Sequence, residues 1–147
     1  MFINKIHELN EGEKPYFNNR YTDKKKLLKS TINITATISK VKPNKIYLKL
    51  IIDISYDLEK EKINIIKADY WRYVDIDLHE DEQQNKENYF IPFFSMVVDT
   101  LSEIGKRLIN EIPPEIYSIS LPLMDGNDIE TQARAIYEEI LKQALKQ

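Results

Sequence analysis

Cysteine is absent from this 147-residue chain, and glycine occurs only three times. Without cysteine, the protein has no disulfide, no thiolate metal ligand and no thiol nucleophile. Three glycines are too few for the glycine-rich loops that hold phosphate groups in nucleotide-binding proteins. The two histidines, His7 and His79, are far apart in sequence, so a histidine-rich metal cluster is also excluded.

Long apolar runs are missing as well. No run approaches the roughly 20 residues that a membrane-spanning helix needs. The first residues, Met1-Phe2-Ile3-Asn4-Lys5, lack the basic-then-apolar layout of a signal peptide, so we expect a cytoplasmic location. A chain of this length, with 42% apolar and 31% charged residues, is typical of one globular domain, here 1–147.

The charge is unevenly distributed along the chain. Residues 1–74 carry 15 Lys and Arg against 9 Asp and Glu, whereas residues 75–147 carry 6 against 15. A basic half can mark a nucleic-acid surface, but lysines also commonly protect turns and sheet edges. We favour the second interpretation and expect no nucleic-acid partner, because no arginine joins the main lysines, which are Lys24–Lys26, Lys29, Lys40, Lys42 and Lys45.

The period of the apolar residues changes at Pro92. Before it, apolar residues recur at every second position, which is typical of strands, and after it they recur every three or four, which is typical of helices. The pattern predicts an α+β fold in which a four-stranded antiparallel sheet within 31–78 precedes two helices within 90–147. The expected strands are 31–39, 45–56, 63–68 and 70–78, and residues 1–30 have no clean period, so we expect them to be irregular.

Prolines and polar residues indicate where the helices begin and end. We expect the first helix to carry Pro92 in its first turn and to end near Ile109, after a polar loop at 80–88. An extended, proline-containing loop follows, and a last helix spans Ile129 to Ala144. Within the loop, Ile119, Leu121 and Leu123 alternate with polar residues or proline, which predicts either a fifth strand or a lid over a groove.

One stretch could carry metal chemistry. Asp75, Asp77 and His79 alternate along one strand face, where side chains could converge on a hard cation. The same residues also make an ordinary solvated face, and no second ligand cluster accompanies them. Serine catalysis would need a serine on a tight, glycine-flanked turn, which is not present. We therefore expect no enzymatic activity, no catalytic residue, no metal and no cofactor.

The aromatic residues are better candidates for function. Trp71 and Tyr73 share one face of the last predicted strand, opposite the face of Tyr70 and Arg72. If the helices cover the second face, Trp71 and Tyr73 lie on an outer surface, and large exposed aromatics often mark a partner surface or an oligomer interface. The alternative is a sheet covered on both faces, with these rings in the core.

The order of these elements resembles the SecB-like protein-export chaperone superfamily over residues 31–145. The matching features are the strands from Thr31 to Leu78, a helix opened by Ile91-Pro92-Phe93-Phe94, the loop Ile119–Leu123 and the last helix. Family members carry a loop written roughly Pro-x-Leu-x-Leu-x-Pro. This chain has Pro114 and then Ile119, Leu121 and Pro122, so its spacing differs.

The resemblance implies a homo-oligomer, a dimer or tetramer, that binds unfolded polypeptide in an apolar groove. A non-native client offers apolar side chains and unpaired backbone, which an extended apolar groove with open strand edges can bind. Docking of a secretion motor is not carried over, because Ile65 and Ile66 stand about where acidic residues would be expected. The groove candidates are Trp71, Tyr73, Ile119, Leu121 and Leu123.

Two other functions stay open. The first is a phage or mobile-element structural or anti-defence protein that binds one folded partner through the same aromatic face. The second is a metal-dependent enzyme or nucleic-acid binder that uses Asp75, Asp77 and His79 or the lysine-rich turns.

Overall fold

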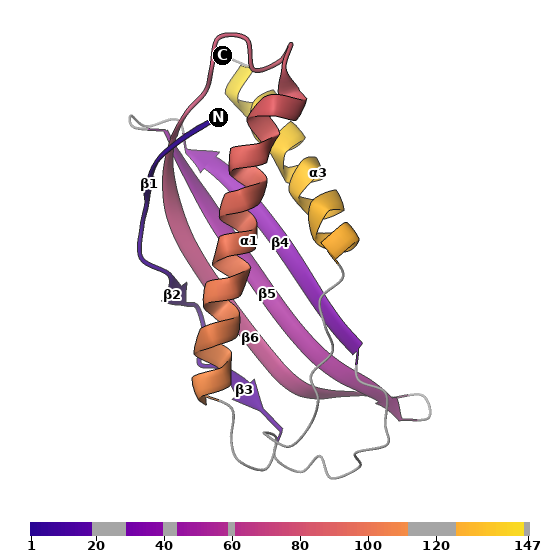
Figure 1. Cartoon of the computed structure of the whole chain (residues 1–147). Helices are drawn as coiled ribbons and strands as arrows, with labels where there is room; N and C mark the ends of the chain where they lie inside the picture. Colours follow the sequence, from indigo (N-terminus) through magenta and orange to yellow (C-terminus); the bar gives the residue numbers. More distant parts are fainter. Residues whose placement is uncertain (19–28, 40–43, 59–60, 112–125, 146–147) are drawn as a thin grey trace.

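A computed structural model of the protein describes residues 1–18, 29–39, 44–58, 61–111 and 126–145. Within them, one antiparallel sheet carries two long helices on the same face (Figure 1). Neither helix is long and apolar enough to cross a membrane. The elements are β1 (Phe2–Ile6), β2 (Asn10–Glu11), β3 (Tyr16–Phe17), β4 (Lys29–Ser39), β5 (Lys45–Leu58), β6 (Glu61–Asp77), α1 (Lys86–Glu111) and α3 (Gly126–Leu145).

The sheet is a meander of three long strands, and three short strands together take the place of a fourth. β4 pairs with β5, and β5 pairs with β6, both antiparallel. The short strands β1, β2 and β3 follow one another along the other edge of β6. The predicted α+β class is therefore confirmed. The predicted count of four strands is wrong, because the sheet has six among the described residues, and three of these lie in the segment 1–30 that we expected to be irregular.

One β-bulge interrupts the regular pairing of β6 with β5. Ile54 of β5 is paired with Ile66, but the next residue, Ser55, is paired with Asn64. Ile65 is therefore an extra residue in β6, and both Ile65 and Ile66 are fully buried. A bulge of this kind shifts the side-chain alternation by one position. The strand continues without a break from Glu61 to Asp77, so the predicted strands 63–68 and 70–78 are one strand, and the predicted break at Asp69 is wrong.

The core lies between the inner face of the sheet and the two helices. Even-numbered positions supply the inner face in β4, in most of β5 and in β6 beyond the bulge, where Tyr70, Val74 and Ile76 have no exposed surface. Each helix adds one apolar stripe. The helical core residues are Phe90, Phe93, Met96, Val97, Leu101, Ile104 and Leu108 of α1, and Ile129, Ala133, Tyr137, Ile140 and Leu141 of α3.

Helix α1 begins earlier than the sequence pattern indicated. Its first residue is Lys86, so Pro92 lies inside the helix rather than in its first turn. The preceding residue, Asn85, accepts the N–H of Tyr89 through its carbonyl oxygen at 3.2 Å, which is the first hydrogen bond of the helix. Because Asn is a favoured residue at this cap position, the helix begins within the polar segment that we expected to be a loop.

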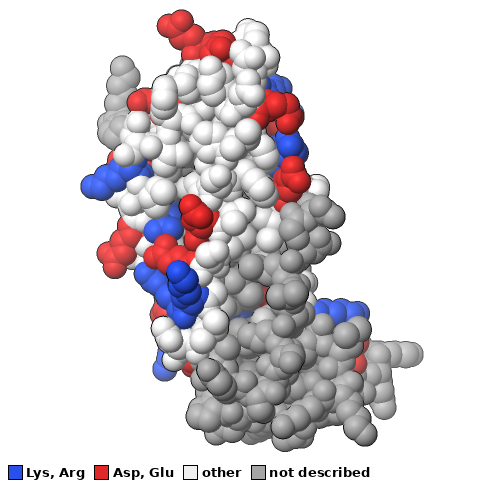
Figure 2. All heavy atoms as spheres, in the orientation of Figure 1, with Lys and Arg blue, Asp and Glu red and all other residues white. Residues whose placement is uncertain are grey.

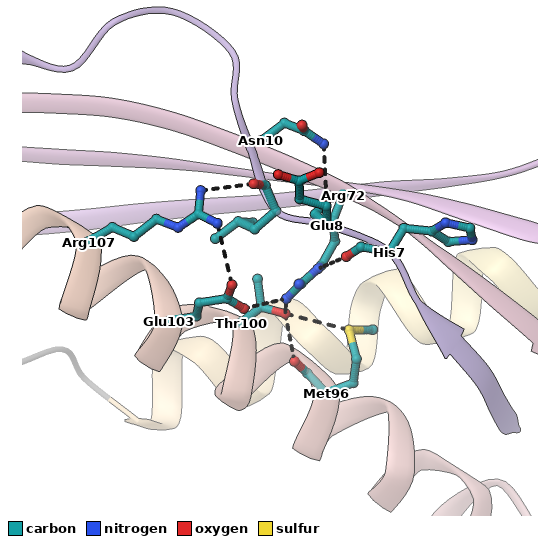
Figure 3. A network of polar contacts seen from close by, with 9 residues as sticks. His7, Glu8, Asn10, Arg72, Met96, Thr100, Glu103 and Arg107 are labelled. Carbon is teal, nitrogen blue, oxygen red and sulfur yellow. Dashed lines mark hydrogen bonds and ion pairs between the residues drawn. The ribbon is translucent and has the colours of Figure 1, made fainter.

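A buried arginine connects α1 to the sheet (Figure 3). The guanidinium of Arg72, on the inner face of β6, donates to the carbonyl of His7 at 3.0 Å and to the hydroxyl of Thr100 at 3.2 Å. It also donates to Glu103 at 3.0 Å. Arg107, one helical turn further, donates to the carbonyl of Leu9 at 2.8 Å. These contacts hold α1 against β6 and against the turn after β1.

A second buried polar group lies near the start of α1. The carboxylate of Glu82 is almost fully buried and accepts hydrogen bonds from the Tyr137 hydroxyl and from the N–H of His79. Burial, reinforced by this bond to Glu82, raises the pKa of the Tyr137 phenol far above its ordinary value. Glu82 therefore links α3 to the turn between β6 and α1.

Candidate functional site

The face of the sheet opposite the helices, called here the outer face, is formed by odd-numbered residues of β5 and β6. Successive side chains of a strand point to opposite faces, so burial of Tyr70, Val74 and Ile76 under the helices directs Trp71, Tyr73 and Asp75 outward. The structure thus places Trp71 and Tyr73 where the alternation predicts. No described residue forms a second layer over this face.

Three aromatic rings meet at the centre of the outer face. The antiparallel register pairs Tyr47 of β5 with Tyr73 of β6 and pairs Lys49 with Trp71. The ring centroids of Tyr47 lie 5.6 Å from those of both Trp71 and Tyr73, and the latter two rings lie 5.5 Å apart. We call Tyr47, Trp71 and Tyr73 the aromatic cluster. Tyr73 is 41% exposed, and the two other rings are half-buried.

Ion pairs neutralise the charges around the aromatic cluster. The Lys49 ammonium lies 3.5 Å from Asp69, and the Lys45 ammonium lies 4.0 Å from Asp75. The Nε2 atom of His7 lies 3.0 Å from the same oxygen of Asp75. Because these charges are paired on the sheet, the surface around the rings carries little unbalanced charge. A partner can cover it without leaving a buried, unpaired charge.

A shallow hollow continues the site along β5 and β6. It has a volume of about 150 Å³, and Ile51 of β5 lies within its lining beside Asp69. Gly12 permits the N-terminal segment to approach closely here, since a Cβ at this position would lie 2.6 Å from a carboxylate oxygen of Asp69. The lining residues are Glu13, Lys14, Tyr16, Ile51, Lys67, Ala68 and Asp69.

The predicted site residues divide into two groups. Trp71 and Tyr73 are in contact, whereas Ile119, Leu121 and Leu123 lie outside the described residues. Sequence reasoning missed Tyr47. The alternation along the strand 45–56 put Tyr47 on the outer face, but only the register of the β5–β6 hairpin places it against Trp71 and Tyr73. That register depends on the bulge at Ile65, which the sequence pattern did not reveal.

The alternative metal site does not form. Asp75 pairs with His7 and Lys45, while Asp77 accepts a hydrogen bond from Asn4 at 2.7 Å. The ring of His79 stacks on Tyr89 with centroids 4.0 Å apart. Each of the three proposed ligands therefore has a different neighbour. Among the described residues, no group of three or more His, Asp or Glu side chains is placed to hold a metal ion.

The lysine-rich turns are only partly described. Lys24–Lys26, Lys40 and Lys42 lie outside the described residues. Lys29, at the start of β4, lies 2.6 Å from Asp57, and Lys45 pairs with Asp75. These two described lysines thus pair with carboxylates within the sheet, as expected for lysines that protect strand ends.

Helix α1 also presents exposed apolar residues. In Figure 2 the surface over the N-terminal half of α1 is largely white, and charged side chains gather toward its C-terminal end and at the margins. Ile91 is 61% exposed there, and Val98 is 38% exposed. Ser95 lies between these two residues along the helix, and single exposed apolar residues are normal on a protein surface.

Comparison with known proteins does not establish a family for this chain. No family model matches the sequence, and no curated protein matches it. Among solved structures, the chain is similar to the SecB-like chaperone Rv1957 of Mycobacterium tuberculosis, solved with a ChAD peptide from the Rv1956 HigA1 antitoxin. The identity is 8% and the TM-score 0.38, over 82% of this chain and 90% of that chain. Membership of the SecB-like superfamily therefore stays a prediction, and the proposals below rest on the geometry of this chain alone.

Proposed function

We propose that this protein is a non-catalytic, chaperone-like protein that binds unfolded or non-native polypeptide through the outer face of its sheet. The observation that carries the proposal is the aromatic cluster of Tyr47, Trp71 and Tyr73, which lies on the face opposite the helices and includes the exposed ring of Tyr73. The loop residues Ile119, Leu121 and Leu123 stay predicted members of the same surface. A cytoplasmic location stays a prediction as well.

The cluster has the physical properties that binding of apolar chain segments requires. Aromatic rings provide a large apolar area with few rotatable bonds, so little conformational entropy is lost when a partner covers them. Contacts between the three rings restrict their motion before any partner arrives. Non-native polypeptide exposes the apolar side chains that a folded protein hides, and their burial against the rings is the main favourable term.

The surroundings of the cluster favour sequence-tolerant binding. Pairing of Lys49 with Asp69 and of Lys45 with Asp75 leaves no strong field of one sign that would select an acidic or a basic segment. Thr35 and Thr37 of β4 pair with Lys49 and Tyr47 of β5, so small polar side chains flank the cluster on that side. A bound chain would therefore be held mainly by apolar contact at the rings.

The same surface suits the second candidate, one folded partner. Rings fixed by mutual contact at the centre of a flat face, with ion pairs at the margin, are also typical of hot spots between folded proteins. The two functions differ in the state of the partner. Only the first predicts that many unrelated unfolded chains bind.

Capture of a chemically unfolded protein tests the proposal. A slow-folding protein is diluted from denaturant into buffer that contains a stoichiometric amount of this one, and aggregation is followed by light scattering. We expect suppressed aggregation and a complex that can be isolated. Replacement of Trp71 or Tyr73 with serine should weaken capture by about tenfold or more, because each removes a central aromatic contact.

Ile91→Ser is the matched control, since Ile91 is an exposed apolar residue on the helical face. This variant should capture clients as well as the wild type does. Circular dichroism and urea unfolding establish that each variant is folded. The proposal is contradicted if the wild type captures no unfolded chain, which would favour the folded partner. It is also contradicted if Trp71→Ser and Tyr73→Ser capture clients as well as Ile91→Ser.

A further inference from the structure

Residues 10–17, called here the edge segment, run along the free side of β6. The segment contains β2 and β3, each only two residues long, and both pair with β6. Between these short strands, the N–H of Gly12 donates to the carbonyl of Asp69 at 2.9 Å. The edge segment also supplies one wall of the hollow on the outer face, through Glu13, Lys14 and Tyr16. How firmly the segment is held therefore affects the shape of the candidate binding face.

The edge segment also meets the C-terminal end of α1, which lies beside β3 (Figure 1). A second hollow, of about 330 Å³, lies between them and includes Glu111, the last residue of α1. Its lining residues are Glu11, Lys14, Pro15, Phe17 and Glu111. Glu11 pairs with Tyr70 of β6, so its side chain lies on the same face of the sheet as Tyr70, toward the helices. Two carboxyl groups from different elements thus line one hollow.

The side chains of Glu11 and Glu111 are hydrogen-bonded to each other. Ionised carboxylates only accept hydrogen bonds, so this contact requires a proton on one of the two carboxyls. The end of α1 favours that state, since a helix C-terminus disfavours negative charge and the last turn contains no basic residue. Burial at the hollow, together with the hydrogen bond to Glu11 and its negative charge, raises the pKa of the Glu111 carboxyl above its ordinary value.

Three other titratable groups face this pair. Arg107, one helical turn before Glu111, opposes part of the rise in the pKa of Glu111. Lys14 lines the same hollow. The Tyr70 hydroxyl is buried and has no hydrogen-bond partner; burial raises its pKa, and the negative charges of Glu111 and Glu11 add to that rise. Among the described residues, neither cation forms an ion pair with Glu11 or Glu111, so the shared proton is what joins the two carboxyls.

We propose that Glu11 and Glu111 form a proton-dependent latch, which holds the edge segment against the end of α1 while the two carboxyls share a proton and loosens it when both are ionised. In the closed state, the Glu111 carboxyl donates to the Glu11 carboxylate. Loss of the proton leaves two negative charges within hydrogen-bond distance, and their repulsion separates the segment from the helix. This inference concerns the shape of the outer-face hollow and does not depend on client binding.

The direction of the pH dependence follows from the raised pKa of Glu111. Because the folded state holds the proton more tightly than the unfolded state, the latch contributes fully below the ordinary glutamate pKa of about 4.3. The contribution is lost as the pH rises through the higher pKa of the folded state. The edge segment should therefore be held more firmly in mild acid than above neutral pH.

Hydrogen exchange of the Gly12 amide tests the proposal, because its bond to Asp69 reports on how firmly the edge segment is held. The protection factor is measured by NMR at pH 4.5 and pH 7.5, with correction for the intrinsic exchange rate. We expect the wild-type value to fall about fivefold at the higher pH, since two exposed like charges at this separation repel each other weakly. In Glu111→Gln, the amide donates to Glu11 at either pH, so the protection factor should stay the same.

Glu8→Gln is the matched control, because Glu8 is an exposed glutamate that does not line the hollow, and the variant removes the same charge. It should keep the wild-type response. Histidines also titrate in this pH interval, but Glu111→Gln leaves both in place, so they cannot cause a difference between that variant and the wild type. A wild-type protection factor that is equal at the two pH values would overturn the proposal. A Glu111→Gln variant with the full wild-type response would overturn it as well.

Discussion

Replacement of Arg72 with methionine tests how the helical layer is held on the sheet. Arg72 is 7% exposed, and its guanidinium bonds the His7 carbonyl, Thr100 and Glu103. Methionine keeps an unbranched, flexible side chain of similar length, so the variant removes the polar contacts while it leaves no large cavity.

The expected cost follows from what each partner retains. Thr100 still donates to the carbonyl of Met96 at 2.9 Å, and Glu103, which is 41% exposed, keeps water and Arg107. The His7 carbonyl loses the bond from Arg72, and an unsatisfied acceptor costs about 1–3 kcal/mol. The variant also avoids the cost of burying the guanidinium, which offsets part of the loss of its charged hydrogen bonds. We therefore expect the free energy of unfolding to fall by about 2 kcal/mol.

Urea unfolding followed by circular dichroism measures this loss. For a domain of this size, 2 kcal/mol corresponds to a fall in melting temperature of about 4–8 °C. Arg107→Met is the control and should cost less than Arg72→Met, because Arg107 is half-exposed and water can replace its bond to the Leu9 carbonyl. An Arg72→Met variant as stable as the wild type, or more stable, would refute the reasoning. The polar contacts of Arg72 would then fix the position of α1 on the sheet without adding to the free energy of unfolding.

Three further predictions concern stability. Gly12→Ala should cost about 1–2 kcal/mol in urea unfolding, because its Cβ would lie 2.6 Å from Asp69 Oδ2. Gly105→Ala should stabilise the protein by about 0.5–1 kcal/mol, because Gly105 lies in the middle of α1 and nothing lies within 4 Å of the new Cβ. A Gly12→Ala variant that is more stable than Gly105→Ala would contradict the packing at both positions. Burial raises the pKa of Tyr70 to about 12. Because the folded state holds this proton more tightly, the stabilisation is complete below about pH 10 and is lost as the pH rises toward 12, so Tyr70→Phe should make the alkaline decline in stability shallower. An unchanged decline in that variant would refute this assignment.

Regular alternation made part of the fold predictable from sequence. From Ile32 to Ile38 of β4 and from Ile46 to Ile54 of β5, the even-numbered residues are all apolar and lie on the face toward the helices, so the strands and their faces could be predicted. The last helix could be predicted within a few residues for the same reason. The edge segments were not predictable, because β2 and β3 are two residues long and exist only through pairing with β6.

The candidate site was predictable to a similar extent. Alternation alone put Trp71 and Tyr73 together on the outer face, since two residues separated by one position on a strand share a face. The third ring, Tyr47, required the register between β5 and β6, which the bulge at Ile65 shifts by one residue. The sequence signal of the bulge is the pair of consecutive isoleucines, Ile65 and Ile66, which breaks the alternation, but this signal does not give the pairing partner of Tyr47.

The fluorescence of Trp71 gives the most direct test of the proposed binding surface. Trp71 is the only tryptophan in the chain, so its emission reports on the aromatic cluster alone when the client is a permanently unfolded polypeptide without tryptophan. If clients bind the outer face, titration should shift the Trp71 emission to shorter wavelength and saturate at the stoichiometry of the isolated complex. A complex that forms while the Trp71 emission stays unchanged would show that clients bind elsewhere and would contradict the proposed function of this face.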